Sequence, residues 1–324
     1  MSLIVVTGAT GTQGGSVARL LAKDPSWKVR GVTRNVDSDK ARELEALGIE
    51  MVSANLDDAS SLPRAFEGAM AIFGTTNFWE IAFKDGVEAA TAGEEKQFVN
   101  IADAAAKMPT LKHLVLSTMP NCEIISGGKL PCPHWDAKAR GGEYVKKTYP
   151  ELAAKTTEIW MGWYVDNLVN LPLSAPQPFL GKYLLALPSK AEGIVPVAGV
   201  VELNTGIVVQ AILAQAEKSF GKFVPVLTDL IPWSAVVEGW SMVTGKTAVY
   251  AELSDKAAVK MWGPVFGADM PKQFRFSEQH PDWYSYHPDS TVTIKDLGIE
   301  GDVYGWEQGL KHYTTRLQAE VRSS

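Results

Sequence analysis

Hydrophobic and polar positions along the first half of the chain follow a pattern typical of short strands separated by amphipathic helices. Apolar runs predict strands at residues 3–7, 28–32, 50–53, 71–75, 113–117 and 157–161. Between the strands, apolar residues at helical spacing predict helices at residues 14–22, 39–47, 60–66, 94–106 and 136–148. Alternation of this kind favours an α/β fold, in which a parallel sheet carries helices on both faces.

The pattern becomes less regular in the second half of the chain. Prolines exclude a regular helix from residues 171–178. Helical spacing returns at residues 205–216 and 233–244 and in a last amphipathic helix that carries Trp306, Leu310, Tyr313 and Leu317. We expect a first domain of residues 1–170, to which some later segments return, and a smaller α/β C-terminal lobe of residues 171–324. Because ligands of open α/β sheets bind at the carboxyl ends of the strands, this lobe is well placed to form the other wall of a cleft.

A glycine-rich turn follows the first predicted strand directly and leads into the first predicted helix. Its glycines recur as G-x-x-G-x-x-G at Gly8, Gly11 and Gly14. Such a turn lets a pyrophosphate approach the backbone at a helix N-terminus, where free N–H groups and the helix dipole favour anions. The motif therefore predicts a dinucleotide site in a Rossmann-type doubly wound sheet, the alternative being a purely structural turn.

Composition narrows the class of protein. The chain has 324 residues, 46% of them hydrophobic, and a net charge of −6 without a basic block, which gives direct nucleic-acid binding little support. No apolar run is long enough for a membrane span, and the first predicted strand begins too early for a signal peptide, so we expect a cytoplasmic protein. Cys122 and Cys132 lack the spacing of metal ligands, so we expect no metal site. Free thiols are favoured for them over a disulfide.

The end of the second predicted strand indicates which dinucleotide binds. NAD-binding folds usually place an acidic residue here to bind the adenosine ribose. This chain instead has Arg34 and Asn35. A guanidinium is a suitable partner for the 2′-phosphate of NADP, so we predict NADP(H) rather than NAD(H).

Several segments taken together resemble the NmrA-like family of atypical short-chain dehydrogenases/reductases, and within it the HSCARG-type NADPH-sensor branch. They are TGATGTQGGSVARLL, VRGVTRN, TTNFWE, HWDAK and YVDN, and the resemblance extends to Phe274–Phe276. It implies that the cofactor contacts residues just after the strand ends. The implied contacts are Gly8, Ala9, Thr10, Gly11, Thr12, Gln13 and Gly14 at the pyrophosphate; Arg34 and Asn35 at the 2′-phosphate; Asn55 and Leu56 at the adenine; Thr76, Asn77, Phe78 and Lys138 at the nicotinamide-side ribose; and Tyr164, Val165, Asp166 and Asn167 at the nicotinamide.

The catalytic candidates depart from the usual pattern. Ordinary short-chain dehydrogenases use Tyr-x-x-x-Lys, whose spacing places both side chains on one helix face. Here His134 replaces the tyrosine and Lys138 is kept. Histidine can exchange protons near neutral pH, although a loop residue without a chemical role is the alternative for His134. Ser117 and Thr118 occupy the region of the usual catalytic serine and are candidates to orient a carbonyl.

Two functions of different classes remain open from the sequence. The first is an NADPH-dependent reductase of a carbonyl, imine or enone in a small or medium-sized apolar substrate. The second is a redox sensor that reads the NADPH/NADP ratio through its conformation or a regulatory protein partner, which the resemblance also implies. Residues 78–94 are a candidate mobile element for such a sensor, the alternative being an ordinary connecting loop. The oligomeric state is open, a homodimer included.

Overall fold

A seven-stranded parallel sheet forms the centre of the larger domain in the computed structural model, which describes residues 1–323. The strand order is β11-β6-β5-β4-β1-β2-β3, and it reverses between β1 and β4. The strands are β1 (Ser2–Val6), β2 (Trp27–Thr33), β3 (Glu50–Ser53), β4 (Ala71–Gly74), β5 (His113–Thr118), β6 (Thr156–Met161) and β11 (Phe223–Val226). The expected Rossmann-type fold is confirmed, and the six predicted strands lie within one residue of their predicted ends.

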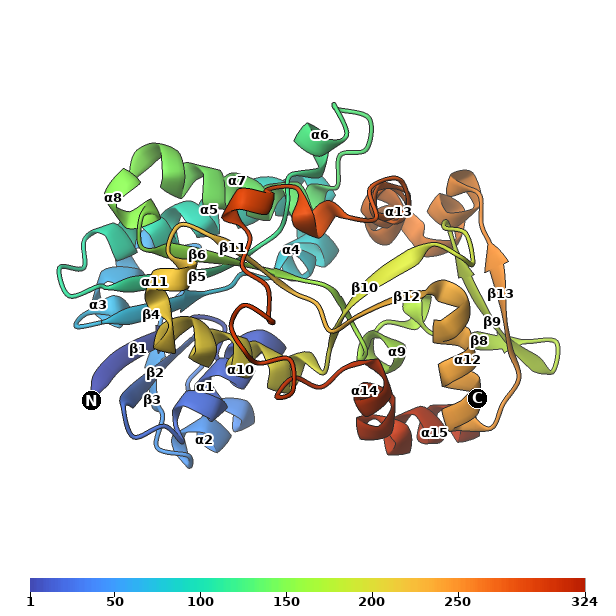
Figure 1. Ribbon diagram of the computed structural model, residues 1–324, viewed down its shortest axis with the longest axis horizontal. Coiled ribbons are helices and arrows are strands. Elements are labelled where there is room, and N and C mark those ends of the chain that lie inside the picture. Colours follow the sequence, from blue (N-terminus) through green and yellow to red (C-terminus); the bar gives the residue numbers. More distant parts are fainter. Residues whose placement is uncertain (324) are drawn as a thin grey trace.

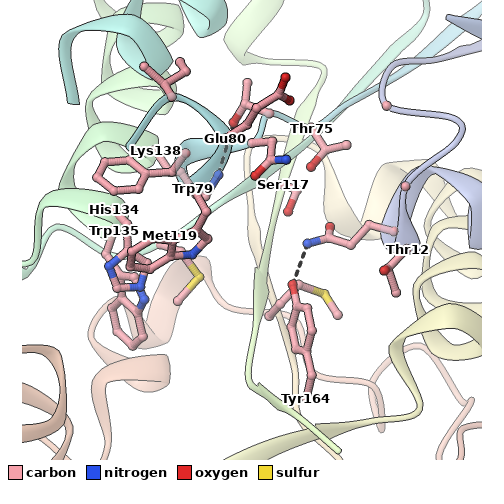
Figure 2. A pocket seen from close by; sticks show the side chains of 18 of the residues that line it. Thr12, Thr75, Trp79, Glu80, Ser117, Met119, His134, Trp135, Lys138 and Tyr164 are labelled. Carbon is pink, nitrogen blue, oxygen red and sulfur yellow. Dashed lines mark hydrogen bonds between the residues drawn. The ribbon is translucent and has the colours of Figure 1, made fainter. Parts of the chain in front are cut away.

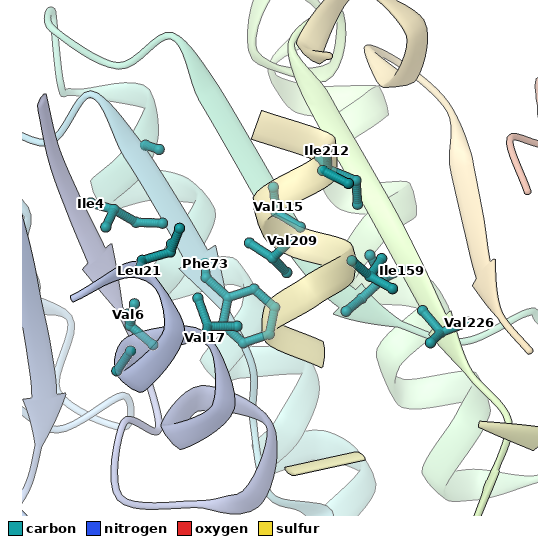
Figure 3. Packing of buried hydrophobic residues seen from close by; sticks show 14 of the residues in the cluster. Ile4, Val6, Val17, Leu21, Phe73, Val115, Ile159, Val209, Ile212 and Val226 are labelled. Atoms are coloured by element: carbon teal, nitrogen blue, oxygen red, sulfur yellow. The ribbon is translucent and has the colours of Figure 1, made fainter. Parts of the chain in front are cut away.

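Helices cover both faces of this sheet because successive strand residues alternate between two apolar cores. The covering helices are α1 (Thr12–Leu21), α2 (Asp39–Glu45), α3 (Leu62–Phe66), α5 (Val87–Ala106), α7 (Pro133–Thr148) and α10 (Val201–Ala214). On one face, Val17 of α1 and Val209 of α10 pack with Ile4 and Phe73 (Figure 3). Helix α10 and strand β11 thus return from the second half of the chain to the large sheet.

The C-terminal lobe has a core of its own beside the large sheet (Figure 1). Its two three-stranded sheets have the orders β12-β10-β7 and β13-β9-β8. The strands are β7 (Trp163–Tyr164), β8 (Gln177–Phe179), β9 (Lys182–Leu187), β10 (Ile194–Gly199), β12 (Asp229–Pro232) and β13 (Ala248–Glu252). The remaining helices of the chain are α4 (Phe78–Asp85), α6 (Cys122–Ile125), α8 (Pro150–Ala153), α9 (Asn167–Asn170), α11 (Ala216–Ser219), α12 (Trp233–Thr244), α13 (Asp255–Gln279), α14 (Trp306–His312) and α15 (Thr314–Ser323).

Several helix boundaries differ from the prediction, those of α7 and α5 with consequences for the site. Helix α7 begins at Pro133, which suits the first helical turn because proline has no N–H to satisfy. Asp136 therefore lies one turn inside the helix, where its carboxylate accepts the N–H of Cys132 (2.7 Å). Helix α5 begins at Val87 rather than Glu94. The predicted last helix is divided into α14 and α15.

Residues 78–94 do not form an ordinary connecting loop in the structure. They contain helix α4 and the first turns of α5, joined at Gly86. The break occurs there because Gly86 has a φ of 92°, which other residues rarely adopt. The loop alternative for this segment was therefore wrong, and the mobile element stays a prediction. The consequence is that α4 presents a helical set of side chains shortly after β4.

Candidate functional site

A cavity of about 1080 Å³ lies at the carboxyl ends of the strands, between the large sheet and the C-terminal lobe. At one end it is lined by the glycine-rich turn and Arg34, and near its middle by Lys138 and His134. Its other end is lined by C-terminal-lobe residues such as Trp233. Figure 2 shows Thr12 and Tyr164 on one side of this cavity and His134, Trp135 and Lys138 on the other.

The glycine-rich turn brings backbone close to the cavity. Gly8 has a φ of 59°, and a Cβ atom on Gly14 would lie 2.3 Å from the carbonyl oxygen of Gly8. Both positions therefore require glycine. Gly11 is the N-cap of α1, and no side chain caps this helix start. The first N–H groups of α1 are thus available to an anion, as a pyrophosphate site needs.

Arg34 follows the end of β2 and forms a bidentate ion pair with Glu80 of α4. Nη1 contacts Oε1, and Nη2 donates to Oε2 over 3.0 Å. The hydrogen bonds that Arg34 donates to Glu80 raise the pKa of the Arg34 guanidinium above its ordinary value. The guanidinium is therefore already oriented to donate two parallel hydrogen bonds to an anion. A phosphate group can accept two hydrogen bonds in the same arrangement.

Lys138 takes part in a closed triangle of polar side chains. Its Nζ donates to Glu94 Oε1 over 2.5 Å and to Thr76 Oγ1 over 3.1 Å, and Thr76 Oγ1 also donates to Glu94 Oε1 over 2.6 Å. Glu94 is completely buried. This arrangement holds the ammonium group at the cavity wall with donor capacity left for a ribose hydroxyl.

Tyr164 reaches across the cavity to the glycine-rich turn. Gln13 Nε2 donates a 2.7 Å hydrogen bond to its hydroxyl, marked by a dashed line in Figure 2. Burial raises the pKa of Tyr164 well above its ordinary value, so the phenol stays neutral. The hydrogen bond connects the first turn of α1 with β7 of the small sheet.

His134 lies in the first turn of α7, among aromatic side chains and against a buried carboxylate. Its ring centroid is 5.1 Å from that of Trp79 and 5.9 Å from that of Phe78. Its Nδ1 contacts Oδ2 of Asp269, and its backbone N–H donates to Oδ1 of the same residue over 3.1 Å. Asp269 belongs to α13 and is completely buried. The imidazole is thus placed in the cavity wall by residues from α4 and α13.

The two hydroxyl candidates after β5 differ in their surroundings. Thr118 Oγ1 donates to Glu158 Oε2 over 2.7 Å and accepts from Trp160 Nε1 over 3.2 Å. Ser117 also lines the cavity, and its hydroxyl has no hydrogen-bond partner within residues 1–323. Of the two, Ser117 is therefore the one with a hydroxyl free to meet a ligand.

Most of the other predicted cofactor contacts also line the cavity: Thr10, Thr12, Asn55, Leu56, Asn77 and Asn167. Four predicted contacts are not among the lining residues in the described part of the chain. Ala9 and Val165 are completely buried in apolar cores. Asp166 accepts a hydrogen bond from Asn170 (3.0 Å), and the exposed Asn35 accepts one from the backbone of Asp37 (2.9 Å).

Neither a metal site nor a membrane span emerges from the described residues. Within residues 1–323, no three His, Cys, Asp or Glu side chains gather closely enough to hold a metal ion. None of the helices there is long and apolar enough to cross a membrane. Cys122 and Cys132 are both buried as free thiols.

Three acidic residues that pair with predicted site residues were missed by sequence reasoning: Glu80, Glu94 and Asp269. Glu80 and Asp269 carry no local sequence signal, because their partners lie 46 and 135 positions away in the chain. Glu94 had one signal. It falls on the face of a predicted helix that also carries Phe98 and Ile101, and a charged residue at an apolar position usually has a buried partner.

The sheet order and the glycine-rich turn at the point of reversal define a Rossmann-type α/β protein with a cleft between two lobes. Within that class, the chain belongs to the NmrA-like family, whose model matches residues 1–297.

The relatives and solved structures include both enzymes and a regulator. The chain is 30% identical over 309 residues to the NmrA-like family domain-containing oxidoreductase cpsB of Aspergillus campestris, covering 90% of this chain and 87% of the relative. It resembles the structure of NmrA, a negative transcriptional regulator, in complex with NADP (TM-score 0.75, 19% identity, 99% of this chain and 97% of that chain). It also resembles the leucoanthocyanidin reductase–NADPH complex from Vitis vinifera (TM-score 0.72, 12% identity, 97% and 100%).

Proposed function

We propose that this protein is an NADPH-dependent reductase of a carbonyl, imine or enone group in an apolar, aromatic-rich substrate. The observation that carries the proposal is the shared cavity, in which a phosphate-binding turn and an ionisable histidine with its aromatic neighbours face the same space. The oxidoreductase name of the Aspergillus relative and the NADPH in the Vitis structure support it.

The cofactor end of the cavity fits NADP(H). Because Gly14 has no side chain, the uncapped start of α1 packs against the carbonyl of Gly8 at the cavity wall, where its free N–H groups would bind a pyrophosphate. Arg34 would bind the 2′-phosphate, and Lys138 would bind ribose hydroxyls. NADPH bound here would supply the hydride. The protein must then orient the substrate, exclude water and provide a proton.

The other end of the cavity suits an aromatic compound without a negative charge. Its lining contains Trp79, Phe83, Trp135, Trp163, Trp233, Phe266, Phe274 and Trp283. All lysine and arginine residues of the lining lie between residues 34 and 138, and none comes from residues 171–323. A carboxylate or phosphate on the substrate would therefore be desolvated at this end without a counter-charge, which is costly.

His134 and Ser117 supply the remaining chemistry in this proposal. When hydride adds to the carbon of a C=O or C=N group, the π electron pair moves to oxygen or nitrogen, which must gain a proton. Protonated His134 gives up the proton of its Nε2 and is reprotonated by solvent. The free hydroxyl of Ser117 would donate a hydrogen bond to the same heteroatom and orient it.

A sensor of the NADPH/NADP ratio is the second candidate, and one observation favours it. The Arg34–Glu80 ion pair joins the expected 2′-phosphate site to α4, whose Trp79 lies 5.0 Å from Phe266 of α13 between ring centroids. A change at Arg34 would thus reach the contact between the two lobes. Such a protein needs only different cofactor affinities in two conformations.

Consumption of NADPH with aromatic ketones, enones and imines tests the two functions. For a reductase, we expect turnover that falls at least about 100-fold in His134→Ala while NADPH affinity is kept, since general acid catalysis contributes about that much or more. His280→Ala, a histidine that does not line the cavity, is the matched control. Absence of turnover on every substrate, combined with an NADPH-dependent change in shape or oligomeric state, would contradict the reductase and support the sensor.

A further inference from the structure

The contact between His134 and Asp269 joins two distant parts of the chain at one imidazole. Asp269 lies in α13 of the C-terminal lobe, after the break in that helix at Gly263, where φ is 71°. Both of its carboxylate oxygens meet His134: Oδ1 accepts the backbone N–H, and Oδ2 contacts Nδ1. Within residues 1–323 neither Nδ1 nor Oδ2 has a hydrogen-bond partner, and the two atoms form an ion-pair contact with each other. The carboxylate is therefore dedicated to this histidine.

This contact determines which ring nitrogen carries a proton. A bare lone pair on Nδ1 facing a carboxylate in a buried site would be repelled, so Nδ1 must bear the hydrogen. Only Nε2 is then left to exchange a proton with the cavity. Trp79 and Phe78 flank the ring and limit its rotation. Asp269 thus controls both the tautomer and the orientation of the imidazole.

We propose that Asp269 is a positioning residue that fixes His134 with the proton on Nδ1, so that Nε2 faces the substrate. This rests on the proposed function insofar as it concerns turnover. When Nε2 gives its proton to the substrate heteroatom, the neutral imidazole that remains is the Nδ1–H form, which the carboxylate accepts. The proton is restored to Nε2 from solvent, and Asp269 itself exchanges none.

Asp269→Asn is the informative variant, because the amide keeps the interaction with the backbone N–H of His134 and reverses the direction of hydrogen bonding at Nδ1. Its oxygen can still accept the backbone N–H of His134, whereas its NH₂ group would donate to Nδ1 and move the proton to Nε2. In ¹⁵N spectra at alkaline pH, assigned by comparison with His134→Ala, we expect the Nδ1–H form in the native protein and the Nε2–H form in the variant. Asp136→Asn is the control. Asp136 is a buried carboxylate on α7, the helix that carries His134, and it accepts hydrogen bonds from the backbone without contacting the imidazole, so this variant should leave the spectrum unchanged.

Kinetics give the second readout. We expect Asp269→Asn to lower kcat about 100-fold with little change in the KM for NADPH, since the loss falls on proton transfer and not on binding. In the His134→Ala background, the same substitution should have no further effect on kcat. An additive loss there would assign Asp269 a merely structural role.

The two readouts separate the failure of this inference from the failure of the proposed function. A native His134 with its proton on Nε2, or a tautomer that Asp269→Asn does not change, overturns the positioning role whatever the activity. If no substrate is turned over, the reductase fails, while the spectra still decide whether Asp269 controls the imidazole.

Discussion

Arg34 and Glu80 form a bidentate ion pair that links the end of β2 with helix α4 at the edge of the cavity. Both side chains are about half exposed, with 61% and 47% of their surface accessible. The carboxylate of Glu80 therefore accepts the hydrogen bonds of the guanidinium that we expect to bind the 2′-phosphate. Cofactor binding would have to rearrange or share this pair, so we expect the two residues to determine how strongly NADPH is preferred over NADH.

Arg34→Ala should weaken NADPH binding far more than NADH binding. A charge-assisted hydrogen-bonded contact contributes about 1.5–3 kcal/mol, which corresponds to a loss of affinity for NADPH of roughly 10- to 100-fold. NADH, which lacks the 2′-phosphate, should lose less than about 3-fold. Calorimetric titration with each cofactor measures both, and Arg42→Ala on the exposed face of α2 controls for the loss of one positive charge. Equal losses for the two cofactors would refute the assignment of Arg34.

Glu80→Gln should strengthen NADPH binding, because it removes the anion that competes for Arg34. Exposed ion pairs contribute at most about 1 kcal/mol, so the expected gain is up to about 5-fold, with no gain for NADH. Glu88→Gln, which removes an exposed charge from the neighbouring helix, serves as the comparison. Weaker NADPH binding would mean that Glu80 holds Arg34 in the geometry the phosphate needs rather than competing with it.

Glu94→Ala should lower the free energy of unfolding by about 3–5 kcal/mol. The substitution leaves the Lys138 ammonium, which is only 17% exposed, without its buried partner. Lys138→Met combined with Glu94→Ala should recover part of this loss, since no unpaired charge then remains. Denaturant unfolding of the single and double variants measures the coupling. Asp85→Ala, which breaks an exposed pair with Lys84, should cost about 1 kcal/mol or less. Fully additive losses for Lys138 and Glu94 would contradict the coupling.

Local sequence patterns predicted the large sheet well, because its strands are short apolar runs bounded by turn residues. The turn at Gly8 and Gly14 could be recognised since backbone strain and close approach both demand glycine there. Strand β11 was missed, although it pairs with β6 in the same sheet. Its sequence, FVPV, contains a proline, which weakens a strand prediction, and only its position at the sheet edge makes the proline acceptable.

The candidate site was only half predictable for a related reason. Residues just after strand ends, such as Arg34 and Thr76, reach the cleft through the topology of the sheet, so their position in the sequence indicates their location. Glu80 and Glu94, the carboxylates that pair with these residues, do not follow strand ends directly, so their position in the sequence does not indicate their location. Asp269 meets His134 only because α13 of the C-terminal lobe packs against the start of α7, and no local pattern encodes that contact.

His113 should make the protein less stable in mild acid. It is 3% exposed, and burial lowers its pKa from the ordinary value of 6.5 to about 4. Its Nε2 hydrogen-bonds Thr157 Oγ1 (2.8 Å), whose own hydrogen goes to the carbonyl of Ser219, so the imidazole is neutral and donates from Nε2. As the pH falls below 6.5, the unfolded chain binds a proton that the folded chain does not bind until about pH 4. The free energy of unfolding should therefore decrease across this interval by roughly 3 kcal/mol in total.

Denaturant unfolding of the native protein and His113→Gln at several pH values isolates this contribution, because all other titrating groups are common to both. A difference between the two proteins that does not change between pH 6.5 and pH 4 would contradict the prediction.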